Sequence, residues 1–110
     1  MPSANRLNQL FSFLEETPND AFTLYAIALE YIAKGEKENA ITYLEKTLST
    51  DVNYVATYYQ LGKLMEERNV ERSKQIYTDG IAKATQQRKM HDANELKQAL
   101  ALLNGEEDEY

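Results

Sequence analysis

Cysteine is absent from the 110 residues of this sequence, which hold only 4 glycines and 2 prolines. The lack of thiols excludes disulfide bonds, thiol catalysis and thiolate metal sites, and it fits a reducing compartment. Glycine and proline interrupt helices, so their scarcity favours long helices joined by short turns. No apolar run approaches the ~20 residues of a membrane span, and the N-terminus does not resemble a secretory signal. We therefore expect a cytoplasmic protein with no membrane partner.

Positive charge is also in short supply, because the formal net charge is −6. Four acidic residues fall within the last five positions, namely Glu106, Glu107, Asp108 and Glu109. Without them, 14 acidic residues face 12 basic ones, and the body of the chain is nearly neutral. Binding to a phosphate backbone needs a basic surface, so we expect no nucleic-acid partner. We predict that residues 104–110 form an acidic, disordered tail.

Residue constellations typical of catalysis or metal binding are missing as well. His91 is the single histidine, and we expect it on a surface loop, where the adjacent Asp92 does not face it. Paired acids such as Glu15 and Glu16 sit at expected helix ends, and neighbours on a helix point about 100° apart. We therefore predict no catalytic residue, no metal ion and no cofactor, which means that the protein is not an enzyme.

Apolar residues recur at helical spacing with no sustained period of two, which predicts an all-α fold. The expected helices cover residues 3–16, 20–34, 37–48, 53–68, 70–84 or somewhat beyond, and 93–103. Pro18 is expected to end the first helix, and Gly35 the second. We expect Asn53 to cap the fourth helix. Asp92 has capping-box spacing to Glu95, so an interruption at 91–92 is predicted before the sixth helix.

Asn19 or Asp20 is expected to cap the second helix, and Asn69 to mark the turn before the fifth.

The most informative pattern, however, is an internal repeat with a period of 34 residues, which indicates stacked supersecondary units. In it, Leu24, Tyr25, Ile27 and Ala28 recur as Tyr58, Tyr59, Leu61 and Gly62. After a slip of one residue, Ala40, Leu44, Thr47 and Leu48 recur as Ser73, Tyr77, Gly80 and Ile81.

This pattern resembles the tetratricopeptide repeat, with its signature Trp-x2-Leu-Gly-x2-Tyr, then Ala-x3-Phe, then Pro. The first unit reads Leu24-x2-Ile27-Ala28-x2-Tyr31, Ala40-x3-Leu44, with Val52 in place of proline. The second reads Tyr58-x2-Leu61-Gly62-x2-Met65, then Ser73-x3-Tyr77. Counting back one period from Ile41, Leu44, Leu48 and Val52 gives Leu7, Leu10, Leu14 and Pro18, so the first helix has the phase of a half-repeat.

The resemblance implies a right-handed superhelical array of antiparallel helix pairs, an α-solenoid of about six helices. We predict a single domain over residues 1–103. Its expected parts are a half-repeat helix (3–17), a first repeat (20–52), a second repeat (53–86) and a capping helix (92–103). Such a fold implies a protein-protein interaction module or adaptor.

The helix over residues 21–33 has a second apolar stripe that the repeat packing does not require. In proteins that resemble this one, the stripe lines a concave groove that receives a peptide or a helix. The predicted partner-binding residues, taken from both repeats, are Phe22, Tyr25, Leu29, Ile32, Tyr59, Lys63 and Glu66. Among them, Tyr25, Leu29 and Tyr59 are the expected anchors, and Lys63 the orienting charge.

Two alternatives to this groove stay open. The stripe is a homodimer interface in the first, and the last helix covers it in the second. The best-known clamp of the family, which grips the C-terminal carboxylate of a chaperone, is not expected. Tyr25, Leu29 and Gln60 stand where that clamp has its first lysine and two asparagines.

Overall fold

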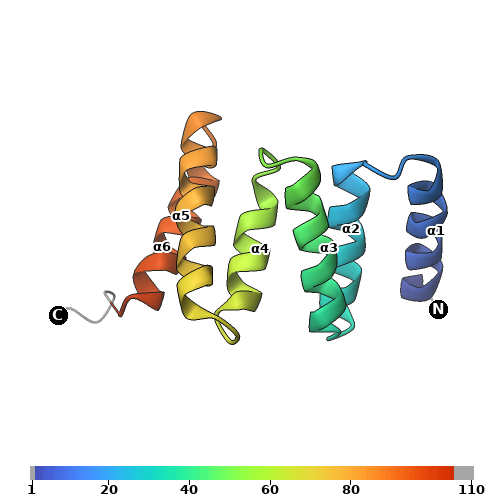
Figure 1. Cartoon of the computed structure of the whole chain (residues 1–110), viewed down its shortest axis with the longest axis horizontal. Coiled ribbons are helices and arrows are strands. Elements are labelled where there is room, and N and C mark those ends of the chain that lie inside the picture. Colours follow the sequence, from blue (N-terminus) through green and yellow to red (C-terminus); the bar gives the residue numbers. More distant parts are fainter. Residues whose placement is uncertain (1, 106–110) are drawn as a thin grey trace. The chain divides into compact units, whose positions relative to one another are not determined.

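Six α-helices and no strands make up residues 2–105, the part of the chain that the computed structural model describes (Figure 1). They are α1 (Pro2–Glu16), α2 (Ala21–Ala33), α3 (Lys37–Thr50), α4 (Ala56–Met65), α5 (Val70–Gln86) and α6 (Met90–Leu103). The predicted all-α fold is confirmed. Most of the predicted acidic tail, residues 106–110, lies outside the described residues. None of these six helices combines the length and the apolar character that a membrane crossing demands.

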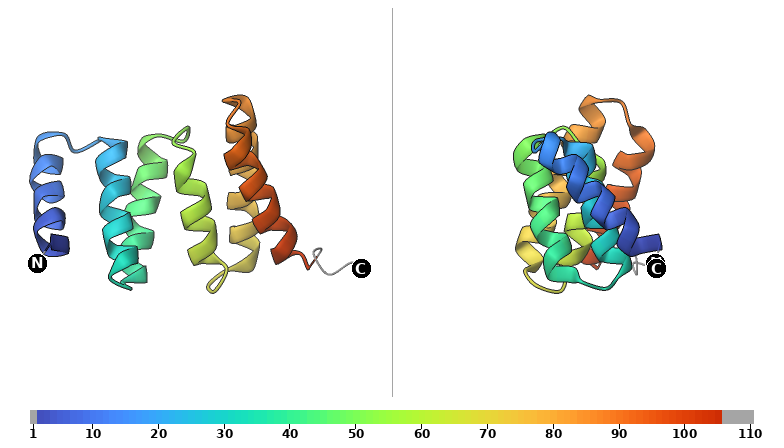
Figure 2. Two further views of the ribbon diagram at one scale, coloured as in Figure 1. Left: turned by 180° about the vertical axis from the view of Figure 1, so that it is seen from behind. Right: turned by 90° about the vertical axis from the view of Figure 1, so that its right-hand side faces the viewer.

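Two compact units divide the chain, Met1–Tyr54 with α1 to α3 and Val55–Tyr110 with α4 to α6. The adjacent antiparallel helices α2 with α3 and α4 with α5 form the pairs that the repeat predicts, while α1 packs on α2 and α6 on α5 (Figure 2). These pairs correspond to the two repeats expected from the 34-residue period. The assignment of residues 1–103 to one domain, with half-repeat and capping helices at its ends, stays a prediction.

The α2–α3 pair begins and turns as its sequence predicts. Asp20 caps α2, because its Oδ2 accepts hydrogen bonds from the backbone N–H of Thr23, at 3.0 Å, and from the Thr23 hydroxyl. Gly35 ends the helix with φ +76°, a conformation that suits glycine. The chain then reverses, and the N–H of Glu36 donates to the carbonyl of Tyr31 at 2.9 Å.

The core of the first unit lies between these two helices. Leu24, Ile27 and Ala28 of α2 are buried, as are Ala40 and Leu44 of α3. The small side chains allow the helices to approach closely while the large ones fill the space between them.

Helix α1 packs on α2, and a ring contact and an ion pair also tie it to the α2–α3 pair. Phe11 meets Tyr43 of α3 edge to face, with the ring centroids 5.9 Å apart. Arg6 pairs with Glu30 of α2 at 2.9 Å.

In the second unit, α4 and α5 hold each other through two reciprocal contacts of glycine with tyrosine. Gly62 of α4 lies against the ring of Tyr77, and Gly80 of α5 lies against Tyr58. The hydroxyl of Ser73 also donates to the carbonyl of Gly62 at 2.7 Å. Because neither glycine has a side chain, the two tyrosine rings fit into the helix interface.

Helix α6 packs mainly on α5 and also contacts α4. Its buried residues, Ala93, Leu96 and Ala99, lie on one face of the helix.

Two of the predicted features of α4 are wrong. The helix begins at Ala56 and not at residue 53, and its N-cap, Val55, makes no side-chain capping bond. Asn53 instead belongs to a turn, in which its backbone N–H donates to Oδ1 of Asp51 at 2.9 Å. The local bond from Asp51 competes with helix initiation and delays it. The helix also ends earlier than predicted, at Met65.

The predicted interruption at residues 91–92 is wrong as well. The chain breaks at Gln87–Lys89, and Asp92 lies in the first turn of α6, whose N-cap is Lys89. Arg88 makes this break in the left-handed region with φ +60°. His91 is exposed, as predicted, but it lies on a helix and not in a loop, with Nε2 3.3 Å from Oε2 of Glu95.

Candidate functional site

Four of the predicted partner-binding residues lie on one face of α2. Phe22, Tyr25, Leu29 and Ile32 are spaced by three and four positions, as one helical face requires. Phe22 is 62% exposed and Leu29 38%, whereas Tyr25 and Ile32 are half-buried. The structure therefore brings these residues together as an apolar surface that the first unit leaves partly open.

Tyr25 is fixed within this surface, which we call the α2 face. Its ring lies 5.3 Å from the ring of Tyr54, measured between centroids. Burial raises the pKa of the Tyr54 hydroxyl above its ordinary value, and the charges of Asp20 and Asp51 raise it further. Tyr54 therefore stays neutral, and the paired rings form a firm apolar support.

Tyr59 and Lys63 occupy the corresponding face of α4 in the second unit. They are one helical turn apart, with the Lys63 Nζ 6.0 Å from the centre of the Tyr59 ring. Both line a pocket of about 250 Å³ that Gln98, Leu102 and two neighbouring residues of α6 complete. The sequence names no α6 residue for this site, because the last helix lacks the repeat pattern that marks the stripe. The alternative in which the last helix covers the stripe does bring α6 here, and α6 lines the pocket while Lys63 stays exposed.

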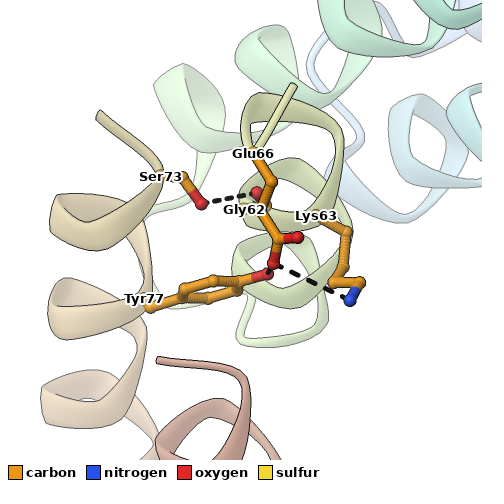
Figure 3. Close-up of polar contacts among 5 residues, drawn as sticks. All are labelled: Gly62, Lys63, Glu66, Ser73 and Tyr77. Atoms are coloured by element: carbon orange, nitrogen blue, oxygen red, sulfur yellow. Dashed lines mark hydrogen bonds and ion pairs between the residues drawn. The ribbon is translucent and has the colours of Figure 1, made fainter. Parts of the chain in front are cut away.

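Glu66, the seventh predicted residue, is engaged inside its own unit. Its Oε2 accepts a hydrogen bond of 2.6 Å from the Tyr77 hydroxyl and lies 3.7 Å from Nζ of Lys63 (Figure 3). Burial of Tyr77, followed by this hydrogen bond, raises the pKa of its hydroxyl well above the ordinary range. Glu66 therefore links the buried core of the α4–α5 pair to the exposed Lys63.

A larger hollow lies in the first unit, away from all seven predicted residues. It measures about 800 Å³ and opens between α1 and α3. Phe11 and Leu14 of α1, Pro18 of the following turn and Leu24 of α2 supply its apolar lining, while Glu15 and Glu45 are among its charged residues. We call it the α1–α3 cleft. The sequence predicts that Leu14 and Pro18 take part in repeat packing. The spacing of apolar residues along a helix does not predict a cleft between two helices.

No group of three or more histidine, aspartate or glutamate side chains suited to a metal ion occurs within residues 2–105.

Comparison with known proteins gives matches among solved structures. A scan against models of protein families finds no match, and neither does a search of the curated proteins. The crystal structure of a tetratricopeptide repeat domain protein from Salinibacter ruber is 34% identical, with a TM-score of 0.74, and the match covers 78% of this chain and 97% of that one. A solution structure of a tetratricopeptide repeat domain protein from the same organism gives the same identity and TM-score, and covers 84% and 95%.

A protein from Bordetella parapertussis has a similar solution structure. Its TM-score is 0.76 and its identity 20%, with 91% of this chain and 88% of that chain covered. This likeness concerns the fold alone. The Salinibacter ruber matches combine higher identity with nearly complete coverage of those chains, and the contact of Gly62 with Tyr77 joins two signature positions of the second repeat. This chain belongs to the tetratricopeptide repeat family.

Proposed function

We propose that this protein is a non-enzymatic adaptor that binds a peptide or a helix of another protein. Membership of the tetratricopeptide repeat family supports a protein-interaction module in general. The proposed binding surfaces are the α2 face and the Tyr59–Lys63 face of α4. In each unit, these are the residues that remain on the stripe once the packing of the repeat is satisfied.

The observation that carries the proposal is the exposure of Phe22 and Leu29. Both are large apolar side chains on one face of one helix, 62% and 38% exposed. Contiguous exposed apolar surface is characteristic of interaction sites, whereas single exposed apolar residues are ordinary. Phe22 and Leu29 are flanked by the half-buried Tyr25 and Ile32, so the apolar surface extends along the helix.

Preorganisation explains how such a small surface binds. The ring of Tyr25 is supported by Tyr54, and the Lys63 ammonium lies between the Tyr59 ring and the Glu66 carboxylate. Side chains that are already held lose little rotamer entropy when a partner arrives. In this proposal Tyr25, Leu29 and Tyr59 are the anchors, Lys63 is the orienting charge, and Glu66 acts through Lys63.

A crosslinking pull-down followed by titration of the captured partner tests this function. We expect Phe22→Ala/Leu29→Ala to weaken capture by about tenfold or more, since central apolar anchors contribute the most to binding. Phe13→Ala is the matched control, because Phe13 is also exposed, at 51%, but lies on α1. Circular dichroism confirms that each variant is folded.

Equal capture by the wild type and by Phe22→Ala/Leu29→Ala would contradict the proposed surface. The homodimer alternative has its own readout, the mass measured by light scattering at micromolar concentration. A dimer that Leu29→Asp converts to a monomer would assign the α2 face to self-association and not to a partner. The cytoplasmic location expected from the sequence stays a prediction.

A further inference from the structure

We propose that the α1–α3 cleft is a second binding surface, and that its ligand is a basic amphipathic helix of a partner protein. The cleft shares no residue with the α2 face or with the Tyr59–Lys63 face. Its existence therefore does not depend on the function proposed above. The argument rests on the shape of the cleft, its lining and the charge around it.

The shape of the cleft suits a helix. Two helices that run in the same direction, α1 and α3, form its sides, and the start of α2 contributes to its floor (Figure 1). Phe11 and Leu14 of α1 are three positions apart on one helical face, and Pro18 of the following turn extends the apolar lining beyond the end of the helix. An apolar groove of this kind receives the apolar stripe of an amphipathic helix. The volume of about 800 Å³ leaves space for several side chains.

The charge around the cleft specifies a basic ligand. Glu15 of α1 and Glu45 of α3 lie in its lining, on opposite sides. Both helices also end beside the cleft, and neither has a basic residue in its last turn. A helix C-terminus carries a partial negative charge that attracts cations. Two carboxylates and the C-terminal ends of α1 and α3 therefore surround the apolar floor, and they outnumber the one lysine of the lining and the N-terminal end of α2, which Asp20 caps.

One lysine belongs to the described lining, and its position is consistent with this charge pattern. The Nζ of Lys46 lies 4.6 Å from the centre of the Tyr43 ring. The ring stabilises the ammonium through a cation–π contact. Lys46 offsets one of the two glutamates of the lining, Glu15 and Glu45, so the lining keeps an excess of negative charge.

Fluorescence anisotropy with designed peptides tests the proposal. The probe is a labelled helix of about five turns, made of alanine, leucine and lysine, with leucine at positions i, i+3, i+4 and i+7 and lysine on either side. One control peptide replaces every lysine with glutamate. A second keeps the composition but scatters the leucines. The titrations are done in about 150 mM salt, where the Debye length is about 8 Å, so that interactions between more distant charges are largely screened.

Matched variants make the result specific to the cleft. Glu15 and Glu16 are both exposed and both in the last turn of α1, but only Glu15 lines the cleft. We expect Glu15→Lys to weaken binding of the leucine–lysine peptide by about five- to tenfold, because reversal of this charge removes an attraction and adds a repulsion. Glu16→Lys should change it by less than about twofold, since it alters the same net charge outside the cleft. Lys46→Glu should strengthen binding, an effect that misfolding does not produce.

The proposal is overturned by any of four results. In the first, the leucine–lysine peptide does not bind up to millimolar concentration; in the second, the glutamate peptide or the peptide with scattered leucines binds equally well. In the third, Glu15→Lys and Glu16→Lys change the affinity equally. In the fourth, light scattering shows a dimer of this chain that Glu15→Lys dissociates. The last result would assign the cleft to a second copy of this chain. Phe22→Ala/Leu29→Ala should leave peptide binding unchanged, so failure of the α2 face is distinguished from failure of the cleft.

Discussion

The reciprocal contacts of glycine with tyrosine predict that two single methyl groups destabilise the second unit. A Cβ added at Gly80 would lie 2.5 Å from Cβ and 2.9 Å from Cγ of Tyr58. One added at Gly62 would lie 2.3 Å from Cε1 and 2.7 Å from Cδ1 of Tyr77. All four distances are far inside van der Waals contact. The substitutions to make are Gly80→Ala and Gly62→Ala, each within a helix.

The magnitudes follow from two opposing effects. Replacing glycine with alanine inside a helix stabilises it by about 1 kcal/mol through propensity. Overpacking a filled interface costs about 1–3 kcal/mol. At Gly80 the obstructing atoms are next to the backbone of Tyr58, so relief requires α4 itself to move, and the cost is at the upper end. We predict a net loss of about 2 kcal/mol for Gly80→Ala.

Gly62→Ala should cost less, about 1 kcal/mol net, because the atoms in the way belong to a ring that can shift. The shift is limited, since Tyr77 is fully buried and its hydroxyl donates to Glu66. Urea unfolding followed by circular dichroism measures both losses. In thermal unfolding, 1 kcal/mol corresponds to roughly 4–8 °C for a domain of this size.

A double-mutant cycle identifies the cause. In a Tyr77→Leu background the ring is gone, and Gly62→Ala should become neutral or stabilising relative to Tyr77→Leu alone. The reasoning is refuted if both single substitutions raise stability by the ~1 kcal/mol that propensity alone provides. It is equally refuted if Gly62→Ala has the same effect in both backgrounds, because the clash would then not involve Tyr77.

Three further predictions concern single side chains. The pKa of the Tyr77 hydroxyl is raised above 10.0 in the folded protein, so the stability that this group contributes is complete below that pH and is lost as the pH rises above it. Tyr77→Phe should therefore lose about 1 kcal/mol of unfolding free energy near neutral pH. Its stability should also fall less steeply at alkaline pH, which urea unfolding at increasing pH would measure. Thr57 is fully buried, and its Oγ1 has no hydrogen-bond partner among the described residues. Thr57→Val should therefore raise the free energy of unfolding by about 1 kcal/mol. A lower free energy of unfolding would mean that the hydroxyl is hydrogen-bonded. Arg88 and Gly35 both lie in the left-handed region, with φ +60° and φ +76°, which glycine adopts more readily than other residues. Arg88→Gly should therefore stabilise the protein by about 0.5–1 kcal/mol in calorimetry. Gly35→Ala should destabilise it by about the same amount through backbone strain alone, because no atom lies within 4 Å of an added Cβ.

Features decided by local chemistry were predictable from the sequence. Asp20 caps α2 and Gly35 ends it as expected. The Asp20 carboxylate accepts a hydrogen bond from a free backbone N–H of the first turn, and glycine adopts the left-handed conformation that ends a helix, so both effects involve near neighbours in the sequence. The glycine and tyrosine pairs were also predictable in outline, since the 34-residue period places small residues opposite large ones.

The break between α5 and α6 was not predictable from residue type. The sequence offers a capping box at Asp92, but the chain breaks at Arg88, a residue without helix-ending preference, in the left-handed region. There the N–H of Lys89 donates to the carbonyl of Ala84 at 2.8 Å, just as the N–H of Glu36 donates to Tyr31 after Gly35. The hydrogen bonds of the turn and the packing of α6 on α5 outweigh the local strain at Arg88.

The candidate sites divide in the same way. The α2 face was predictable, because helical periodicity separates the residues used by the repeat from those left over. The connection of Glu66 to Tyr77 was not, since it joins residues 11 positions apart on two helices. The α1–α3 cleft was not predictable either. A cleft depends on how far apart two helices lie, and side-chain patterns along each helix do not report that separation.

The polar residues of α2 strengthen the argument for a binding role. In most surface helices the exposed positions are polar and the buried positions apolar. In α2 the order is partly reversed, because Thr23 is 1% exposed while Phe22 beside it is 62% exposed. Thr23 is bonded to Asp20, and Glu30 is paired with Arg6. Both polar positions are therefore used to hold the first unit together. The exposed Phe22 makes no comparable contact within the first unit, which leaves it available to the partner in the function proposed above.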